Sequence, residues 1–280
     1  GEIWGYQVDR LYQNDDFVYE NGKLVTMKST DGYTVNKLSD PNAPTQGKLQ
    51  TSSNFRFGPG DVKFKDLNGD GVINNGSQLI DDYGDLSVIG NTTPRYEYSF
   101  RLGMEYKGVD FSVFFQGVGK RDMWGASPLA IPGFNSSDGA MPKVIAQDFW
   151  YETYDGSGNV IDSNYDAFYP RAYNLGASST GNNMQVCDRY LLNMAYLRMK
   201  NLTIGYTMPR QLTRKAMINN VRIYISLENF LTFDKLRGLP IDPEEIAGYS
   251  LLNTSNYNSS RTGVGVPTFK SASVGLQLTF

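Results

Sequence analysis

The sequence predicts an all-β protein whose antiparallel strands form part of a large transmembrane β-barrel. Several segments alternate apolar and polar side chains with a period of two; in 272–280, apolar residues take every even position. The connections between these segments alternate between long and short. Outer-membrane barrels have short periplasmic turns and long extracellular loops, so both observations favour a barrel.

Six segments carry the strand pattern. We expect strands at about residues 2–13, 94–107, 109–123, 196–208, 221–233 and 268–280. Lys107-Gly108 joins two of them and predicts a tight hairpin. Arg198 and Lys200 share the parity of Leu202, which predicts that both lie on the lipid face near the outer end of their strand, where a charge costs little.

Six strands are too few to close a membrane barrel. The remaining strands come either from a missing N-terminal portion of a longer protein or from several chains that combine, and we expect the first of these. We also expect the edge of the last strand to pair with a first strand outside these residues. The opening residues do not read as a signal peptide. A soluble β-sandwich explains the alternation equally well, but it does not explain the order of long and short connections.

Composition narrows the function classes. The chain has 280 residues, a net charge of −3, one cysteine and no histidine. The charge argues against a nucleic-acid partner, and a single cysteine cannot form an internal disulfide. Without histidine, the commonest general base and zinc ligand is missing. No stretch is long and apolar enough to predict a transmembrane helix.

The motif D-L-N-G-D-G-V-I-N matches the first half of a calcium-binding loop. Oxygen ligands at alternating positions would come from Asp66, Asn68, Asp70, the Val72 carbonyl and Asn74. The closing glutamate of such loops is replaced by a serine, Ser77, so the last ligand would have to come from elsewhere. The candidates are Asp81, Asp82 and Asp85, and we take Asp81 as the first of them. The alternative is a turn stabilised by its own side-chain hydrogen bonds, without a metal.

Catalytic motifs of the common hydrolase, nucleotide-binding and zinc types do not occur, and the sequence predicts no enzyme. Charged side chains on the inward parity predict an interior ion-pair network drawn from Arg95, Glu97, Arg101, Glu105, Arg222 and Glu228. Aromatic residues of the long loops offer surfaces for stacking on sugars or peptides, although packing within the loops is the simpler role. These aromatics are Trp124, Phe134, Phe149, Trp150, Tyr151, Tyr154, Tyr169, Tyr173, Tyr249 and Tyr257.

An ordered set of segments then resembles a known family. The segments include G-E-I-W-G-Y-Q-V-D-R-L-Y-Q, P-G-D-V-K-F-K-D-L-N-G-D-G-V-I, V-I-G-N-T-T-P-R-Y-E-Y-S-F, Y-L-R-M-K-N-L-T-I-G-Y-T-M-P and L-E-N-F-L-T-F. Together they resemble the C-terminal portion of the SusC/RagA family of TonB-dependent outer-membrane transporters of Bacteroidota. The resemblance covers essentially the whole chain. It departs from the family at 74–87, where the interval after the calcium-like motif is longer.

The resemblance implies a 22-stranded barrel in the outer membrane, with a plug and N-terminal strands that lie outside this chain. It implies import of an oligosaccharide, or else an oligopeptide, energised by the TonB complex. It also implies a SusD-like lipoprotein that covers the extracellular mouth. The alternative function is a soluble or surface-attached, calcium-dependent binding protein rich in β-structure.

Overall fold

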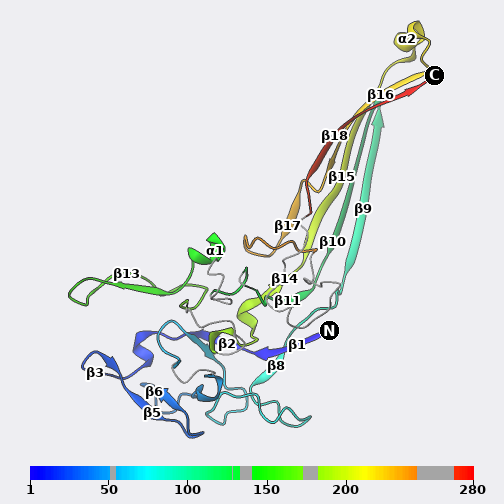
Figure 1. Cartoon of the computed structure of the whole chain (residues 1–280). Coiled ribbons are helices and arrows are strands. Elements are labelled where there is room, and N and C mark those ends of the chain that lie inside the picture. The colour runs from blue at the N-terminus through cyan, green and yellow to red at the C-terminus, as the bar shows by residue number, and fades with distance from the viewer. Residues whose placement is uncertain (51–54, 128, 133–140, 173–181, 245–267) are drawn as a thin grey trace, which may run out of the picture.

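The computed structural model describes residues 1–50, 55–127, 129–132, 141–172, 182–244 and 268–280. Long antiparallel strands form one sheet, and a compact region built from the long connections lies at one end of it (Figure 1). We call this compact part the loop region. No helix among the described residues is both long enough and apolar enough to cross a membrane.

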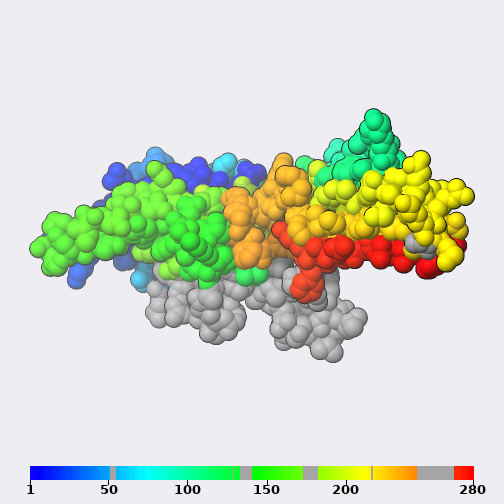
Figure 2. Space-filling model, turned by 90° about the horizontal axis from the view of Figure 1, so that it is seen from above, coloured from blue at the N-terminus to red at the C-terminus, as the bar shows by residue number. Residues whose placement is uncertain are grey.

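The sheet contains five long strands in the order β18-β16-β15-β10-β9. Their bounds are Glu97–Tyr106 (β9), Val109–Val118 (β10), Tyr196–Thr207 (β15), Asn220–Glu228 (β16) and Ser271–Thr279 (β18). A short strand, β17 (Thr232–Asp234), pairs with the start of β15. Strands β9 and β18 form the two edges and lie on opposite sides of the sheet (Figure 2).

The short connections lie at the end of the sheet away from the loop region (Figure 1). Lys107 and Gly108 link β9 to β10, and both have positive φ, at 48° and 84°. Two consecutive left-handed residues make the hairpin turn that matches strand twist, so the tight hairpin expected there is present. The second short connection contains α2 (Arg210–Thr213) and the 3₁₀ turn η5 (Arg214–Ala216).

One face of the sheet is apolar across all five strands. Two successive rungs, read from β9 to β18, are Tyr106, Val109, Tyr206, Ile223, Leu276 and Met104, Phe111, Ile204, Ile225, Val274. Val274 is 78% exposed and Leu276 is 61% exposed. An apolar surface of this size is unfavourable in water but suits lipid, so the sheet has the outer face of a membrane barrel wall.

The opposite face is polar, and one ion pair spans three of its strands. Arg222 on β16 donates two hydrogen bonds to Asp110 on β10, at 2.9 and 2.5 Å. The pair passes over Gly205 of the intervening β15, where a Cβ atom would lie 2.4 Å from the carboxylate. Of the inward charges named from the sequence, only Arg222 forms a salt bridge among the described residues, and its partner was not in that set.

The strand prediction was wrong about where Arg198 and Lys200 point. Phe114 pairs with Asn201, but the next residue of β10 pairs with Met199, so Lys200 is an extra residue in β15. Such a β-bulge reverses the parity of every residue beyond it. Arg198 therefore lies opposite Gln116 on the polar face, away from lipid.

The strand expected at 2–13 is also absent from the sheet. Its residues form β1 (Glu2–Tyr6) and β2 (Val8–Leu11), which pair with β8 (Leu86–Asn91) and β7 (Val62–Phe64). Tyr6, Leu11 and Tyr12 are buried among other loop residues, so their apolar side chains serve the loop core and not a lipid face. Two other expected strands are each divided into two. The segment 109–123 contributes to β10 and β11, and the segment 221–233 contributes to β16 and β17.

The loop region has its own hydrophobic core. It draws buried residues from segments as distant as Tyr6 and Ile241, with Phe64, Ile73 and Trp150 nearly inaccessible. Its further strands are β3 (Tyr19–Glu20), β4 (Lys23–Leu24), β5 (Thr26–Lys28), β6 (Thr34–Asn36), β11 (Asp122–Trp124), β12 (Tyr151–Tyr154), β13 (Val160–Asn164) and β14 (Leu191–Asn193). Its helical turns are η1 (Asn14–Asp16), η2 (Gly47–Leu49), α1 (Lys143–Ala146), η3 (Asn182–Met184) and η4 (Asp188–Tyr190).

A buried polar contact joins two distant segments of this core. The Asp61 carboxylate accepts a hydrogen bond from the Asn183 side-chain NH₂ at 2.7 Å, and the Asn183 side-chain oxygen accepts the Val62 backbone N–H at 2.9 Å. Asp61 also accepts the Gly58 backbone N–H at 2.8 Å. Because buried polar groups need such partners, these bonds fix how the two segments cross.

Adjacent residues of β18 test the assignment of the two faces. We expect Val274→Arg to cost about 2–4 kcal/mol in lipid, because it places a charge on the lipid face. Ser273→Arg, on the polar face one residue earlier, should cost much less. Urea unfolding of both variants in lipid vesicles measures the difference, and equal losses would contradict the assignment.

Gly205 tests the cross-strand ion pair. A methyl group there would collide with Asp110 and Arg222, so Gly205→Ala should separate them and cost about 1–3 kcal/mol. The matched control is Gly103→Ala, where the nearest atom to the new carbon would be 3.7 Å away. That control should stay within about 0.5 kcal/mol of wild type in the same unfolding assay. Equal stability of the two variants would show that the ion pair tolerates the methyl group.

Candidate functional site

A pocket lies on the polar face where the sheet meets the loop region. It has a volume of about 480 Å³ and takes its walls from β9, β10, β15 and two loop segments. Its walls include Glu97, Ser99, Phe114, Gln116, Arg121 and Tyr196. Aromatic rings beside amide, hydroxyl and charged groups can hold a polar organic ligand through stacking and hydrogen bonds.

A charge cluster borders this pocket and joins β15 to the segment that follows β17. Arg198 is 4% exposed and donates to Asp242 at 2.7 Å and to Glu244 at 2.8 Å. Its Nε donates to the Thr232 hydroxyl at 2.9 Å. Lys200 approaches the same Glu244 carboxylate at 2.6 Å. The cluster therefore anchors 242–244 across the polar face of the sheet.

The calcium-like motif forms a tight turn closed by its own side chains. The Asp66 carboxylate accepts the backbone N–H groups of Gly69 and Gly71, at 2.6 and 2.9 Å. Asn68 and Asp70 each accept a backbone N–H two residues later, at 2.9 and 2.8 Å. These are the bonds of the metal-free turn that the sequence left open as an alternative.

The far side of the turn is held by Asp85, not by Asp81. Asp85 is fully buried and accepts the backbone N–H groups of Leu67 and Asn74, both at 2.8 Å. Burial raises the pKa of Asp85, although these two bonds act in the opposite direction.

The calcium assignment, with Asn74, the Val72 carbonyl and Asp81 as ligands, stays a prediction. The Val72 carbonyl instead accepts a hydrogen bond from the Asn74 side-chain amide, at 3.0 Å. Within the described ranges, no three carboxylate, cysteine or histidine residues come together as a metal site.

Loop packing accounts for four of the aromatics named from the sequence, because Trp124 and Phe149 pack against the loop core and two others lie inside it. Trp150 is 2% exposed and Tyr169 is 3% exposed, both inside the loop core. Tyr154 remains 54% exposed and donates its hydroxyl to Glu152 at 2.5 Å, beside Tyr165. Four others, Phe134, Tyr173, Tyr249 and Tyr257, lie outside the described residues.

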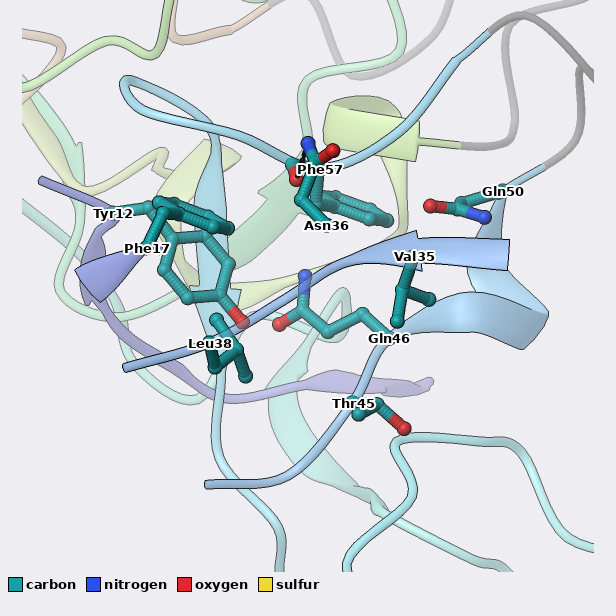
Figure 3. A pocket seen from close by; sticks show the side chains of 9 residues that line it. All are labelled: Tyr12, Phe17, Val35, Asn36, Leu38, Thr45, Gln46, Gln50 and Phe57. Atoms are coloured by element: carbon teal, nitrogen blue, oxygen red, sulfur yellow. Dashed lines mark hydrogen bonds between the residues drawn. The ribbon is translucent and has the colours of Figure 1, made fainter. Parts of the chain in front are cut away.

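A second cavity lies in the loop core and is too small for a ligand. Its volume is about 10 Å³, which leaves room for at most one water molecule. Gln46 is one of its lining residues (Figure 3). Its side-chain amide donates to the Val62 carbonyl at 2.9 Å, and its side-chain carbonyl accepts the Phe64 backbone N–H at 2.7 Å. Gln46 therefore belongs to the scaffold, and this cavity is a packing feature.

The residues of the polar-face pocket were not identified from the sequence as a site. Of its lining residues, Glu97 was named only within a larger set of charged residues, and Arg121 was not named as a functional residue at all. Arg121 lies in the short segment after β10, and its guanidinium meets the carbonyl of Pro243, 122 positions later. Such a contact leaves no local signal in the sequence.

Asp242 offers a test of the charge cluster. Burial alone would raise the pKa of Asp242, but hydrogen bonds from Arg198 and from the Glu244 backbone outweigh it, so the pKa lies below its usual value. A lowered carboxyl pKa stabilises the fold above the pKa of the unfolded chain, and this contribution is lost as pH falls through the lowered value. At pH 7, Asp242→Asn should speed hydrogen exchange of 232–244 on the order of tenfold to a hundredfold.

The difference between wild type and Asp242→Asn should shrink as pH falls below the ordinary aspartate pKa of about 3.9 and on through the lowered value, where the wild-type carboxyl takes up its proton. Asp15→Asn is the control, because Asp15 is exposed and lies outside the cluster. It should leave the exchange of 232–244 unchanged. Identical exchange of wild type and Asp242→Asn at pH 7 would contradict a stabilising role for the cluster.

Known proteins with similar sequences are TonB-dependent receptors. TonB-dependent receptor P3 of Formosa agariphila is 27% identical over 227 residues, and receptor P26 of the same organism is 24% identical over 221 residues. Each match covers 79% of this chain but only 19% and 20% of the relative, so the chain spans about a fifth of these proteins. No family model matches the sequence.

The fold resembles that of the RagAB peptide transporter. The match covers the whole of this chain and 23% of the solved chain, with a TM-score of 0.51 and 18% sequence identity. The RagAB peptide importer in its closed-closed state gives the same TM-score and identity. The chain is therefore similar in sequence to part of the TonB-dependent receptors and similar in fold to part of the RagAB transporter.

Proposed function

We propose that this chain forms part of an active importer that carries a nutrient oligomer across the outer membrane. The cargo that we favour is a glycan, and the alternative is an oligopeptide. The observation that carries the proposal is the two-faced sheet: its apolar face suits lipid, and its polar face bears a ligand-sized pocket beside the loop region. The relatives are TonB-dependent receptors, and RagAB is a peptide transporter, which supports import over catalysis.

The rest of the barrel and a plug domain complete the structure in this proposal. Strands β9 and β18 both leave one edge unpaired within the described residues, and neighbouring barrel strands would hydrogen-bond to those edges. The plug connects the barrel to the TonB complex, which supplies the energy. The loop region then lies outside the cell, because the short turns are at the opposite end of the sheet.

A SusD-like lipoprotein covers the extracellular mouth. Cargo held between this lid and the barrel favours the closed state, because it gains contacts with both proteins there. The loop region is suited to support such a lid, since its own hydrophobic core fixes the shape of its outer surface.

Uptake by cells tests the proposal. A strain carrying the complete receptor and its lid is offered fluorescent oligosaccharides and oligopeptides, and uptake into the periplasm is measured. We expect uptake of at least one class, and we expect it to stop when the receptor gene, the lid gene or TonB is removed. Undiminished uptake without TonB would exclude energised import. A monomer of this chain that folds in water without detergent or partner would exclude the barrel itself.

A further inference from the structure

Arg121 is a buried cation at the wall of the polar-face pocket. It follows β10 and is 4% exposed. One Nη atom donates to the carbonyl of Pro243 at 2.9 Å, whereas Nε meets no acceptor within the part of the chain that the structure describes. The Arg121 carbonyl accepts the Met194 backbone N–H at 2.9 Å, which fixes the position of the residue.

No carboxylate among the described residues forms a salt bridge with Arg121. The neighbouring cations differ in this respect, because Arg198 pairs with Asp242 and Glu244, and Lys200 also pairs with Glu244. Burial lowers the pKa of Arg121, although the nearby Glu97 carboxylate, which forms no salt bridge with it, acts in the opposite direction. A buried guanidinium without an anion is costly, and a bound anion would remove much of that cost.

The surroundings select the kind of anion. Glu97 and Glu244 also line the pocket, so a doubly charged group such as phosphate would meet repulsion there. A singly charged, planar carboxylate meets less repulsion and matches the fork of a guanidinium. Gln116 and Ser99, in the same wall, add an amide and a hydroxyl that can bond the neighbouring polar groups of the ligand.

We propose that this pocket binds a carboxylate group of the cargo through the guanidinium of Arg121. The inference rests on the proposed import function and adds to it the chemical class of the cargo group held at this position. Two kinds of cargo carry such a group: an oligopeptide, at its C-terminus, and a glycan, in its uronic acid units.

Matched pairs of probes test the proposal in the purified complete receptor. One pair is an alanine oligopeptide with a free C-terminal carboxylate and the same peptide as its C-terminal amide. The other pair is an oligogalacturonate and its methyl ester. Titration calorimetry at neutral pH should show that one of the two acids binds at least tenfold more tightly than its uncharged counterpart, and the pair that does so identifies the source of the carboxylate.

Variants then assign the preference to Arg121. Arg121→Gln should abolish the difference between acid and uncharged probe, and Arg121→Lys, which keeps the charge but loses the fork, should reduce it. Arg101→Gln is the control, because Arg101 is an exposed residue of the same face of β9 that does not line the pocket. It should leave the preference intact.

Two results would overturn the proposal: neither acid binds better than its counterpart, or the preference survives Arg121→Gln. An acidic residue from the remainder of the barrel that pairs with Arg121 would produce the first of these. If cells take up a cargo but do not prefer its acid form, the import function stands and this role for Arg121 is excluded. The two proposals therefore fail separately.

Discussion

The hydrogen-bond register of the five long strands is the constraint on which the rest of this structure depends. It aligns apolar side chains from Tyr106 on β9 to Leu276 on β18 into continuous rungs on one face. A slip of one residue in any strand would turn its apolar side chains to the polar face. The ion pair of Arg222 and Asp110 helps to hold this register, because it spans β10, β15 and β16 over a residue with no side chain.

The bulge at Lys200 links the membrane sheet to the site. It reverses the alternation of β15 where the sheet leaves the apolar band, and so it brings Arg198 to the polar face. There, Asp242 and Glu244 compensate its charge and anchor the segment that contains Pro243. The Pro243 carbonyl in turn accepts a hydrogen bond from the guanidinium of Arg121. One extra residue in one strand thus positions the charge cluster and the wall of the pocket together.

The sequence predicted those features that have a local cause. The alternation of apolar and polar residues within 97–106 and 271–279 predicts the two faces of those strands directly, and Lys107-Gly108 predicts the turn between β9 and β10. Features that depend on distant partners were missed. The residues of 2–13 alternate as a barrel strand does, but their pairing with β7 and β8 places them in the loop core. The face of the sheet on which Arg198 lies depends on how β15 pairs with β10. Arg121 is held by a contact with Pro243, which is distant in the sequence.

The division of the sheet into a lipid face and a polar face is the central claim, and site-directed spin labelling tests it most directly. A nitroxide is attached to single cysteines placed in turn at 271–279 of the complete receptor in lipid vesicles. Cys187 will not compete for the label, because it is fully buried and burial raises the pKa of its thiol to about 12. Collisions with oxygen, which dissolves in lipid, should be frequent at even positions such as 274 and 276 and rare at odd positions. An oxygen profile without this period of two, or with the odd positions in lipid, would contradict the account.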